Sequence, residues 1–184
     1  LGKTGETYAY EKACNIVFGI TDEEINSSDM ARGTELEPLA FKLFKEIMIS
    51  EFIEVDDAYF VEKSEDTGGS PDGIVGDDSV LEIKCPRSGK FFKLIHQGIE
   101  AIDKEYICQM QHQMYVTGRS KAYFFNYIIW KGKELFHIIE IERDDVIINK
   151  MVERIKEAVI LRDKYVEEIK SNVQFDLDEL KKLL

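Results

Sequence analysis

Hydrophobic and polar positions follow two different periodicities along the chain, one typical of helices and one typical of strands. Apolar side chains recur every three or four residues in three stretches, which predicts helices over about 34–50, 103–117 and 144–171. Pro38 fits the first of these helices only near its first turn, because proline has no backbone N–H and crowds the preceding turn.

Short apolar runs between these stretches predict strands. A strand is expected over 58–63, and the glycines and proline of 67–71 should end it. Two further pairs of runs flank turn-forming residues and predict hairpins, 74–75 with 80–83 and 121–130 with 134–141. This mixture of helices and strands indicates a mixed α/β or α+β fold.

The 184 residues contain no internal repeat, low-complexity tract or flexible linker, so we expect a single domain over 1–184. With 44% hydrophobic residues the chain can bury a sizeable core. Residues 172–184 form an apolar C-terminal tail, which we expect to act as an oligomer contact. Because the chain begins with Leu1 and not Met, we expect a fragment whose natural N-terminus is missing.

Composition argues against several classes of protein. No apolar run approaches the roughly 18 residues that span a membrane, and no secretory signal opens the chain. Cys14, Cys85 and Cys108 have no C-x-x-C spacing, which argues against a disulfide framework and against a zinc or iron–sulfur site. We therefore expect a cytoplasmic protein without membrane association.

Charge is distributed unevenly. The net charge of −12 argues against sequence-blind binding of nucleic acid. Residues 1–81 carry 6 basic and 19 acidic side chains, however, whereas residues 82–133 carry 9 basic and 4 acidic ones. An acidic protein with a locally basic site is one interpretation, and an ordinary mixed surface is the other.

The first predicted hairpin carries the strongest chemical signal. Glu82 and Lys84 alternate with Leu81 and Ile83, so the charged pair should lie on one face of the strand and the apolar pair in the core. Asp72 joins the charged face only if the hairpin loop has an odd number of residues. A three-residue loop would place it opposite Lys84, and a five-residue loop opposite Glu82.

Two carboxylates and a lysine so placed have a defined chemical use. Carboxylate oxygens bind hard cations such as Mg²⁺, which polarise a phosphodiester and acidify a water molecule. Lys84 would orient that water or stabilise charge on the phosphorus oxygens. The alternative is an exposed hairpin with an ordinary Glu82–Lys84 surface pair, worth under about 1 kcal/mol, and these residues alone leave both interpretations open.

Several motifs, in order, are similar to those of a known nuclease family. Pro71-Asp72 followed by Glu82-Ile83-Lys84 resembles the PD-(D/E)-x-K signature, and the flanking motifs resemble those of the lambda-exonuclease or YqaJ-like viral recombinase family. These flanking motifs are Arg32-Gly33-Thr34-Glu35-Leu36-Glu37, Leu81-Glu82-Ile83-Lys84-Cys85-Pro86, Glu105-Tyr106-Ile107-Cys108-Gln109-Met110-Gln111, Val116-Thr117-Gly118, Phe125-Asn126-Tyr127 and Ile141-Glu142-Arg143-Asp144. The resemblance implies a restriction-endonuclease-like core, with a central mixed sheet flanked by helices.

The resemblance also implies roles for residues of the hairpin. Asp72 and Glu82 would bind the metal, with the carbonyl of Ile83 as a further ligand, and Lys84 would be the catalytic lysine. The implied cofactor is Mg²⁺, for which Mn²⁺ would substitute.

Residues outside the hairpin receive roles in the same way. Glu37 would complete the site by binding a second metal or holding a water, and Gln109 would position substrate or water. From the residues alone, Glu37 is equally an exposed first-turn carboxylate and Gln109 a surface amide. Arg87, Lys90 and Lys93 follow the catalytic lysine closely and would line a track for DNA phosphates.

The function implied is a metal-dependent deoxyribonuclease, a 5′-to-3′ exonuclease that acts on double-stranded DNA ends and leaves 3′ single strands for phage-type recombination. The implied assembly is a homo-oligomeric ring of three copies, and a single-strand annealing protein is the implied partner. The family's segment that holds the 5′-phosphate has no counterpart here, which leaves end recognition open. The alternatives are an endonuclease of the same superfamily and a non-cutting DNA-binding or assembly module.

Overall fold

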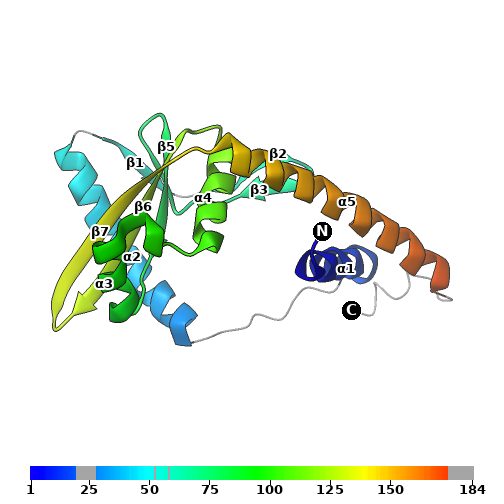
Figure 1. The fold of residues 1–184 in the computed structure, drawn as a ribbon, viewed down its shortest axis with the longest axis horizontal. Coiled ribbons are helices and arrows are strands. Elements are labelled where there is room, and N and C mark those ends of the chain that lie inside the picture. Colours follow the sequence, from blue (N-terminus) through cyan, green and yellow to red (C-terminus); the bar gives the residue numbers. More distant parts are fainter. Residues whose placement is uncertain (20–27, 52, 58, 174–184) are drawn as a thin grey trace. The chain divides into compact units, whose positions relative to one another are not determined.

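The computed structural model describes residues 1–19, 28–51, 53–57 and 59–173 (Figure 1). Its helices are α1 (Lys3–Phe18), α2 (Ser28–Ser50), α3 (Ser88–Gln97), the 3₁₀-helix η1 (Gly98–Ala101), α4 (Lys104–Thr117) and α5 (Asp145–Asn172). Its strands are β1 (Val55–Asp57), β2 (Val61–Ser64), β3 (Thr67–Gly69), β4 (Gly73–Val75), β5 (Ser79–Lys84), β6 (Lys121–Trp130) and β7 (Lys133–Glu142). The chain forms two compact units, one of residues 26–148 and one of residues 1–25 with 149–184.

A five-stranded mixed sheet forms the centre of the unit 26–148. Its strand order is β1-β4-β5-β6-β7, in which β5 and β6 are parallel and the other neighbouring pairs are antiparallel. The first five residues of the central strand β5 are buried, as expected for a strand that is covered on both faces. The predicted fold class, a central mixed sheet flanked by helices, is confirmed.

Alternate side chains of β5 belong to hydrophobic clusters on opposite faces of the sheet. Leu81 and Ile83 pack with buried residues of α2. Val80 lies in the other cluster, with Met110 of α4 and a buried leucine of α3. Glu82 shares the face of Val80, because successive side chains of a strand point to opposite faces. The sheet therefore turns Glu82 toward the side covered by α3 and α4.

The hairpin of β6 and β7 is confirmed and is clearly visible in Figure 1. Its register runs from Lys121 opposite Glu142 to Trp130 opposite Lys133. The turn consists of two residues, 131 and 132, with φ angles of 50° and 74°, which is the backbone conformation of a type I′ turn.

The helices predicted from apolar periodicity are confirmed. The two later ones, α4 and α5, begin within one residue of the predicted positions. The first one, α2, begins six residues earlier than expected, so Pro38 lies inside the helix and not in its first turn. The predicted start was wrong because an interior proline removes one backbone hydrogen bond but does not by itself end a helix.

Two further helices were not predicted from the sequence. In α1 the buried residues are Ala9, Ala13 and Val17, which are small and give a weak apolar stripe, so this helix depends on packing more than on its own hydrophobic pattern. The helix α3 is short but clearly amphipathic, with Phe91 and Leu94 buried.

The strand predicted over 58–63 is wrong in its extent. β1 ends before this segment and pairs with β4 in the main sheet, whereas β2 begins at Val61 and pairs with β3 in a separate two-stranded sheet. Residues 67–69, expected to end a strand, themselves form β3. Pairing with β2 holds these residues extended although glycine has little intrinsic preference for strands.

In the other unit, α1 packs against α5. Ala13, Val17 and Val166 form its buried cluster, and the rings of Tyr10 and Tyr165 meet edge to face at 5.5 Å. Residues 174–184 of the predicted apolar tail lie outside the described residues. Within the described part of the chain, no helix combines the length and apolar character needed to cross a membrane.

Gly73, which directly follows Asp72, has no room for a side chain. A Cβ atom there would lie 3.0 Å from Cε2 of Phe41 and 3.3 Å from both the carbonyl oxygen of Asp56 and Cδ2 of Leu81. We expect Gly73→Ala to lower the free energy of unfolding by about 1–3 kcal/mol, as over-packing does, when it is measured by urea denaturation.

Gly89→Ala is the matched control. Residue 89 lies in the first turn of α3, and a Cβ atom there meets no heavy atom within 4 Å beyond its own turn. Because alanine favours helix over glycine, this variant should be neutral or more stable by up to about 1 kcal/mol. Equal effects of the two substitutions would contradict the tight packing at residue 73.

Candidate active site

The β4–β5 hairpin brings Asp72 to Glu82. Gly73 pairs with Leu81, and the loop has three residues, 76–78, so one further step of the register places Asp72 opposite Glu82. The N–H of Asp72 donates to the carbonyl of Leu81 at 2.9 Å, which continues the pairing. The loop has an odd number of residues, as the site requires. A three-residue loop over 77–79 would have placed Asp72 opposite Lys84, and the observed start one residue earlier makes Glu82 its partner.

Asp72 is held against the backbone of β5. Its Oδ2 accepts a hydrogen bond from the N–H of Ile83 at 2.6 Å. Burial raises the pKa of Asp72 to about 7, and the neighbouring charge of Glu82 acts in the same direction. The Ile83 N–H and the Lys84 ammonium oppose this shift. Asp72 is therefore only about half ionised near neutral pH unless a cation joins it.

Glu82 is fully buried, and both of its oxygens have contacts. Lys84 forms an ion pair with Oε1, and the side-chain amide of Gln113 donates to Oε2 at 2.6 Å. Burial lowers the pKa of Lys84, but the carboxylates of Glu82 and Asp72 outweigh burial and leave this pKa raised. The ammonium also lies 5.1 Å from the ring centroid of Tyr106. An ordinary exposed surface pair is therefore excluded for Glu82 and Lys84.

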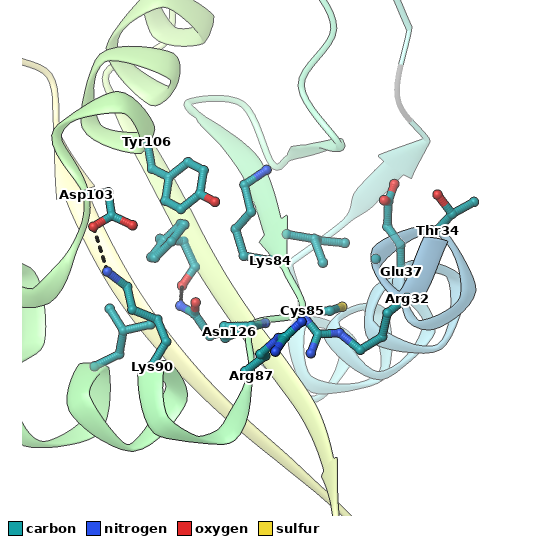
Figure 2. A pocket seen from close by; sticks show the side chains of 15 residues that line it. Arg32, Thr34, Glu37, Lys84, Cys85, Arg87, Lys90, Asp103, Tyr106 and Asn126 are labelled. Atoms are coloured by element: carbon teal, nitrogen blue, oxygen red, sulfur yellow. Dashed lines mark hydrogen bonds and ion pairs between the residues drawn. The ribbon is translucent and has the colours of Figure 1, made fainter. Parts of the chain in front are cut away.

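A cavity of about 600 Å³ adjoins this pair, and Figure 2 shows the side chains that line it. Four of these side chains are cationic: Arg32, Lys84, Arg87 and Lys90. They come from α2, β5, the segment after β5 and α3, so the fold gathers positive charge from separate parts of the chain. Such a cavity suits a phosphate-bearing ligand.

The predicted phosphate track is only partly assembled at this cavity. Arg87 and Lys90 line it, whereas Lys93 is exposed and is not part of the lining. Lys90 also forms an exposed ion pair with Asp103 at 2.7 Å (Figure 2). Arg32 replaces Lys93 as the third cation beside the lysine of β5, and its position within a recognised motif was the signal that could have singled it out.

Glu37 faces the site from α2 without joining the other two carboxylates directly. It is exposed, lines the large cavity, and shares a second cavity of about 240 Å³ with Asp72 and Ile83. Among the residues that the structure describes, no three Asp, Glu, His or Cys side chains converge as a ligand set.

Three glutamines of α4 have different surroundings. Gln109, the one predicted, is exposed and lies one helical turn before Gln113, on the same side of the helix. Gln111 donates to the carbonyl of Glu142 and accepts from the N–H of Asp144, both at 2.8 Å, and so ties α4 to the junction of β7 and α5. Gln113, which contacts the buried glutamate, was not predicted, although its spacing of four from Gln109 gave a signal.

The residues present fit a hard divalent cation. Asp72 and Glu82 supply two neighbouring carboxylates, and Oε1 of Glu82 is buried with the Lys84 ammonium against it. Mg²⁺ keeps several waters and commonly takes only one or two protein carboxylates. The two carboxylates and the carbonyl of Ile83 could therefore hold it.

Most aromatic side chains of β6 belong to the core. Phe124, Phe125 and Tyr127 are buried in the core, as expected for aromatic residues of an alternating strand. Trp130 departs from this expectation, since it is 39% exposed and meets Phe92 edge to face at 5.7 Å. The aromatic residues of β6 are thus core residues except at the end of the strand.

Cys85 lines the cavity next to the lysine. Burial raises the pKa of its thiol to about 11, and the carboxylate of Glu37 acts in the same direction. The thiol is therefore protonated at neutral pH, which argues against a nucleophilic cysteine.

Comparison with known proteins identifies the family of the chain. The family model of the YqaJ-like viral recombinase domain matches residues 3–120, which include the hairpin, the cavity residues of α2 and α3, and α4. The chain belongs to the YqaJ-like viral recombinase family. Among curated proteins, this family member is 33% identical over 72 residues to ExoD of Escherichia coli (strain K12), a match that covers 39% of this chain and 83% of ExoD.

Solved structures resemble this YqaJ-like protein over most of its length. The alkaline exonuclease LHK-Exo of Laribacter hongkongensis is 31% identical, with a TM-score of 0.79 over 92% of this chain and 85% of the other. LHK-Exo in complex with dAMP gives a TM-score of 0.77 at 31% identity, over 90% and 83% of the two chains. A phage-related exonuclease of Haemophilus somnus 129PT shares the fold at 20% identity, with a TM-score of 0.57 over 93% and 84%.

The raised pKa of Asp72 predicts a pH-dependent stability. Since the folded-state pKa of about 7 lies above the ordinary value of 3.8, the folded chain binds this proton more tightly than the unfolded chain. The resulting stabilisation is complete below pH 3.8 and is lost as the pH rises through 7. In EDTA, Asp72→Asn should therefore be more stable than the wild type at pH 8 by about 1 kcal/mol or more, and the difference should shrink toward pH 5.

Thermal unfolding of both proteins between pH 5 and pH 8 measures this difference. Asp77→Asn, in the exposed hairpin loop, is a control that should show no such trend. A difference between Asp72→Asn and the wild type that stays constant with pH would contradict the raised pKa.

Proposed function

We propose that this protein is a metal-dependent deoxyribonuclease, a 5′-to-3′ exonuclease that acts on double-stranded DNA ends and leaves 3′ single strands for phage-type recombination. The observation that carries the proposal is the pairing of half-buried Asp72 with buried Glu82, next to Lys84, which forms an ion pair with Glu82 and lines a cavity with three further cations. Family membership and the similarity to an alkaline exonuclease support it.

Each residue of the site has a distinct part in this proposal. Asp72, Glu82 and the carbonyl of Ile83 would hold Mg²⁺, or Mn²⁺ in its place, and the ion would polarise the scissile phosphate and acidify a water. Lys84 would orient that water or stabilise charge on the phosphate oxygens from its place at the cavity wall. Glu37 would hold a water on the α2 side, and Gln109 would position substrate.

The cavity is the proposed place for the end of the substrate. Its volume suits a nucleotide, and its cations Arg32, Arg87 and Lys90 would bind phosphate oxygens although the chain as a whole is acidic. The dAMP complex of the similar LHK-Exo supports a ligand of this size. A ring of three copies would bring three such cavities around one duplex, and a single-strand annealing protein would receive the product.

Cleavage of linear duplex DNA with 5′-phosphates, compared with closed-circular plasmid, tests the proposal. We expect Mg²⁺-dependent loss of the linear DNA alone, release from the 5′ end in strand-labelled substrate, and no cleavage in EDTA or with the Glu82→Gln variant. Removal of a metal ligand should lower the rate by about a hundredfold or more. Nicking of the plasmid would favour an endonuclease, and no cleavage of either DNA would favour a non-cutting binding module.

The salt dependence of DNA binding tests the cation-lined cavity. With EDTA present to prevent cleavage, Arg87→Ala and Lys90→Ala should each reduce the slope of log K against log salt concentration by about 1, because each removes one phosphate contact. Lys93→Ala removes the same charge from the same segment but outside the cavity lining, so its slope should equal that of the wild type. Equal effects of all three substitutions would contradict a specific role for the cavity.

A further inference from the structure

A buried amide holds one oxygen of the buried glutamate. Gln113 lies in α4 and is only 2% exposed, and its Nε2 donates to Oε2 of Glu82 at 2.6 Å. The other oxygen, Oε1, faces the Lys84 ammonium. The carboxylate is therefore fixed from two elements, the strand that carries it and the helix that covers it.

Packing alone does not account for an amide at this position. Met110 and Met114, its neighbours on the helix, are fully buried residues of the main hydrophobic cluster. Oε1 of Gln113 is buried and accepts no hydrogen bond, which costs stability that an apolar side chain of the same size would not. The bond from its Nε2 is thus the contact that distinguishes Gln113 from a methionine here.

A neutral amide is a suitable hydrogen-bond partner for a carboxylate that binds a metal ion. A lysine or arginine at residue 113 would also fix Oε2, but it would add a second positive charge to that of Lys84 beside Asp72 and Glu82 and so weaken binding of a divalent cation. The amide of Gln113 donates a hydrogen bond and leaves the charge of the carboxylate intact. With Oε2 held, Glu82 presents Oε1 on the side where Lys84 lies.

We propose that Gln113 is a positioning residue that orients Glu82 for metal binding and acts through this carboxylate without touching substrate. The inference rests on the proposed function, because Gln113 would support the metal site on which that function depends. Hydrogen-bond partners of metal ligands typically contribute ten- to a hundredfold to metal affinity.

Titration of the full chain with Mn²⁺ in the absence of DNA, followed by the electron paramagnetic resonance of free Mn²⁺, tests this role. Gln113→Met replaces the amide with an apolar side chain of nearly the same length, and it should weaken Mn²⁺ binding about ten- to a hundredfold. Its unfolding midpoint in EDTA should fall, because Oε2 of Glu82 loses its hydrogen bond, although removal of the unpaired Oε1 of Gln113 offsets part of this loss. Saturating Mn²⁺ should restore its kcat, which it would not do if Gln113 acted on the substrate.

Gln111→Met is the matched control, since it removes another buried amide of the same helix. That amide bonds the backbone of Glu142 and Asp144, so its loss should lower the unfolding midpoint and leave Mn²⁺ affinity unchanged. If Gln113→Met does not fold, Gln113→Asn takes its place, because its shorter amide cannot reach the carboxylate of Glu82.

The outcomes separate this inference from the function on which it rests. Unchanged Mn²⁺ affinity in a folded Gln113 variant, together with lost binding in Glu82→Gln, overturns the positioning role alone. Failure of the wild type to bind Mn²⁺, or full binding by Glu82→Gln, overturns the metal site and the positioning role together.

Discussion

The site depends on one requirement: the fully buried carboxylate of Glu82 needs partners for its negative charge. An unpaired buried charge would destabilise the fold by on the order of several kcal/mol. Lys84 and Gln113 prevent this by contacting one carboxylate oxygen each. Lys84 lies two residues along the same strand, and Gln113 lies on a helix anchored in the main core by Met110 and Met114. Glu82 and its two partners thus lie on a strand and a helix, whereas Asp72 lies in the bend directly before β4.

Two opposite electrostatic environments meet at the lysine of β5. Asp72 and Glu82 place two carboxylates next to Lys84; burial and then the charge of Glu82 raise the pKa of Asp72, so a cation that joins them would favour the ionised form. Arg32, Arg87 and Lys90 line the cavity together with Lys84 and make it favourable for phosphate. Under the proposed function, the first environment serves the metal and the second serves the DNA, so a chain with a net charge of −12 does not need a basic surface throughout.

The central hairpin could be predicted because its alternation of apolar and charged residues is compatible with few structures. Apolar residues alternate with Glu82 and Lys84, so the face of each side chain follows from the strand itself. The residue opposite Asp72 could not be predicted, because the apolar pattern allows the hairpin loop to begin at more than one residue and each start gives a different register. Gln113 was missed because its spacing of four from Gln109 predicts a shared side of the helix but does not show that this side meets the buried glutamate. Arg32 lies in a motif that could have singled it out, but its place at the cavity follows from the packing of α2 on the sheet.

An anomalous difference map from crystals soaked in Mn²⁺ tests the central claim most directly. The account predicts one strong peak at about 2.2 Å from a carboxylate oxygen of Asp72, from Oε1 of Glu82 and from the carbonyl oxygen of Ile83. Oε2 of Glu82 should keep its hydrogen bond to Gln113 in that structure. A peak elsewhere in the molecule, or no peak between Asp72 and Glu82 in a protein whose cleavage of DNA requires Mn²⁺, would contradict the account.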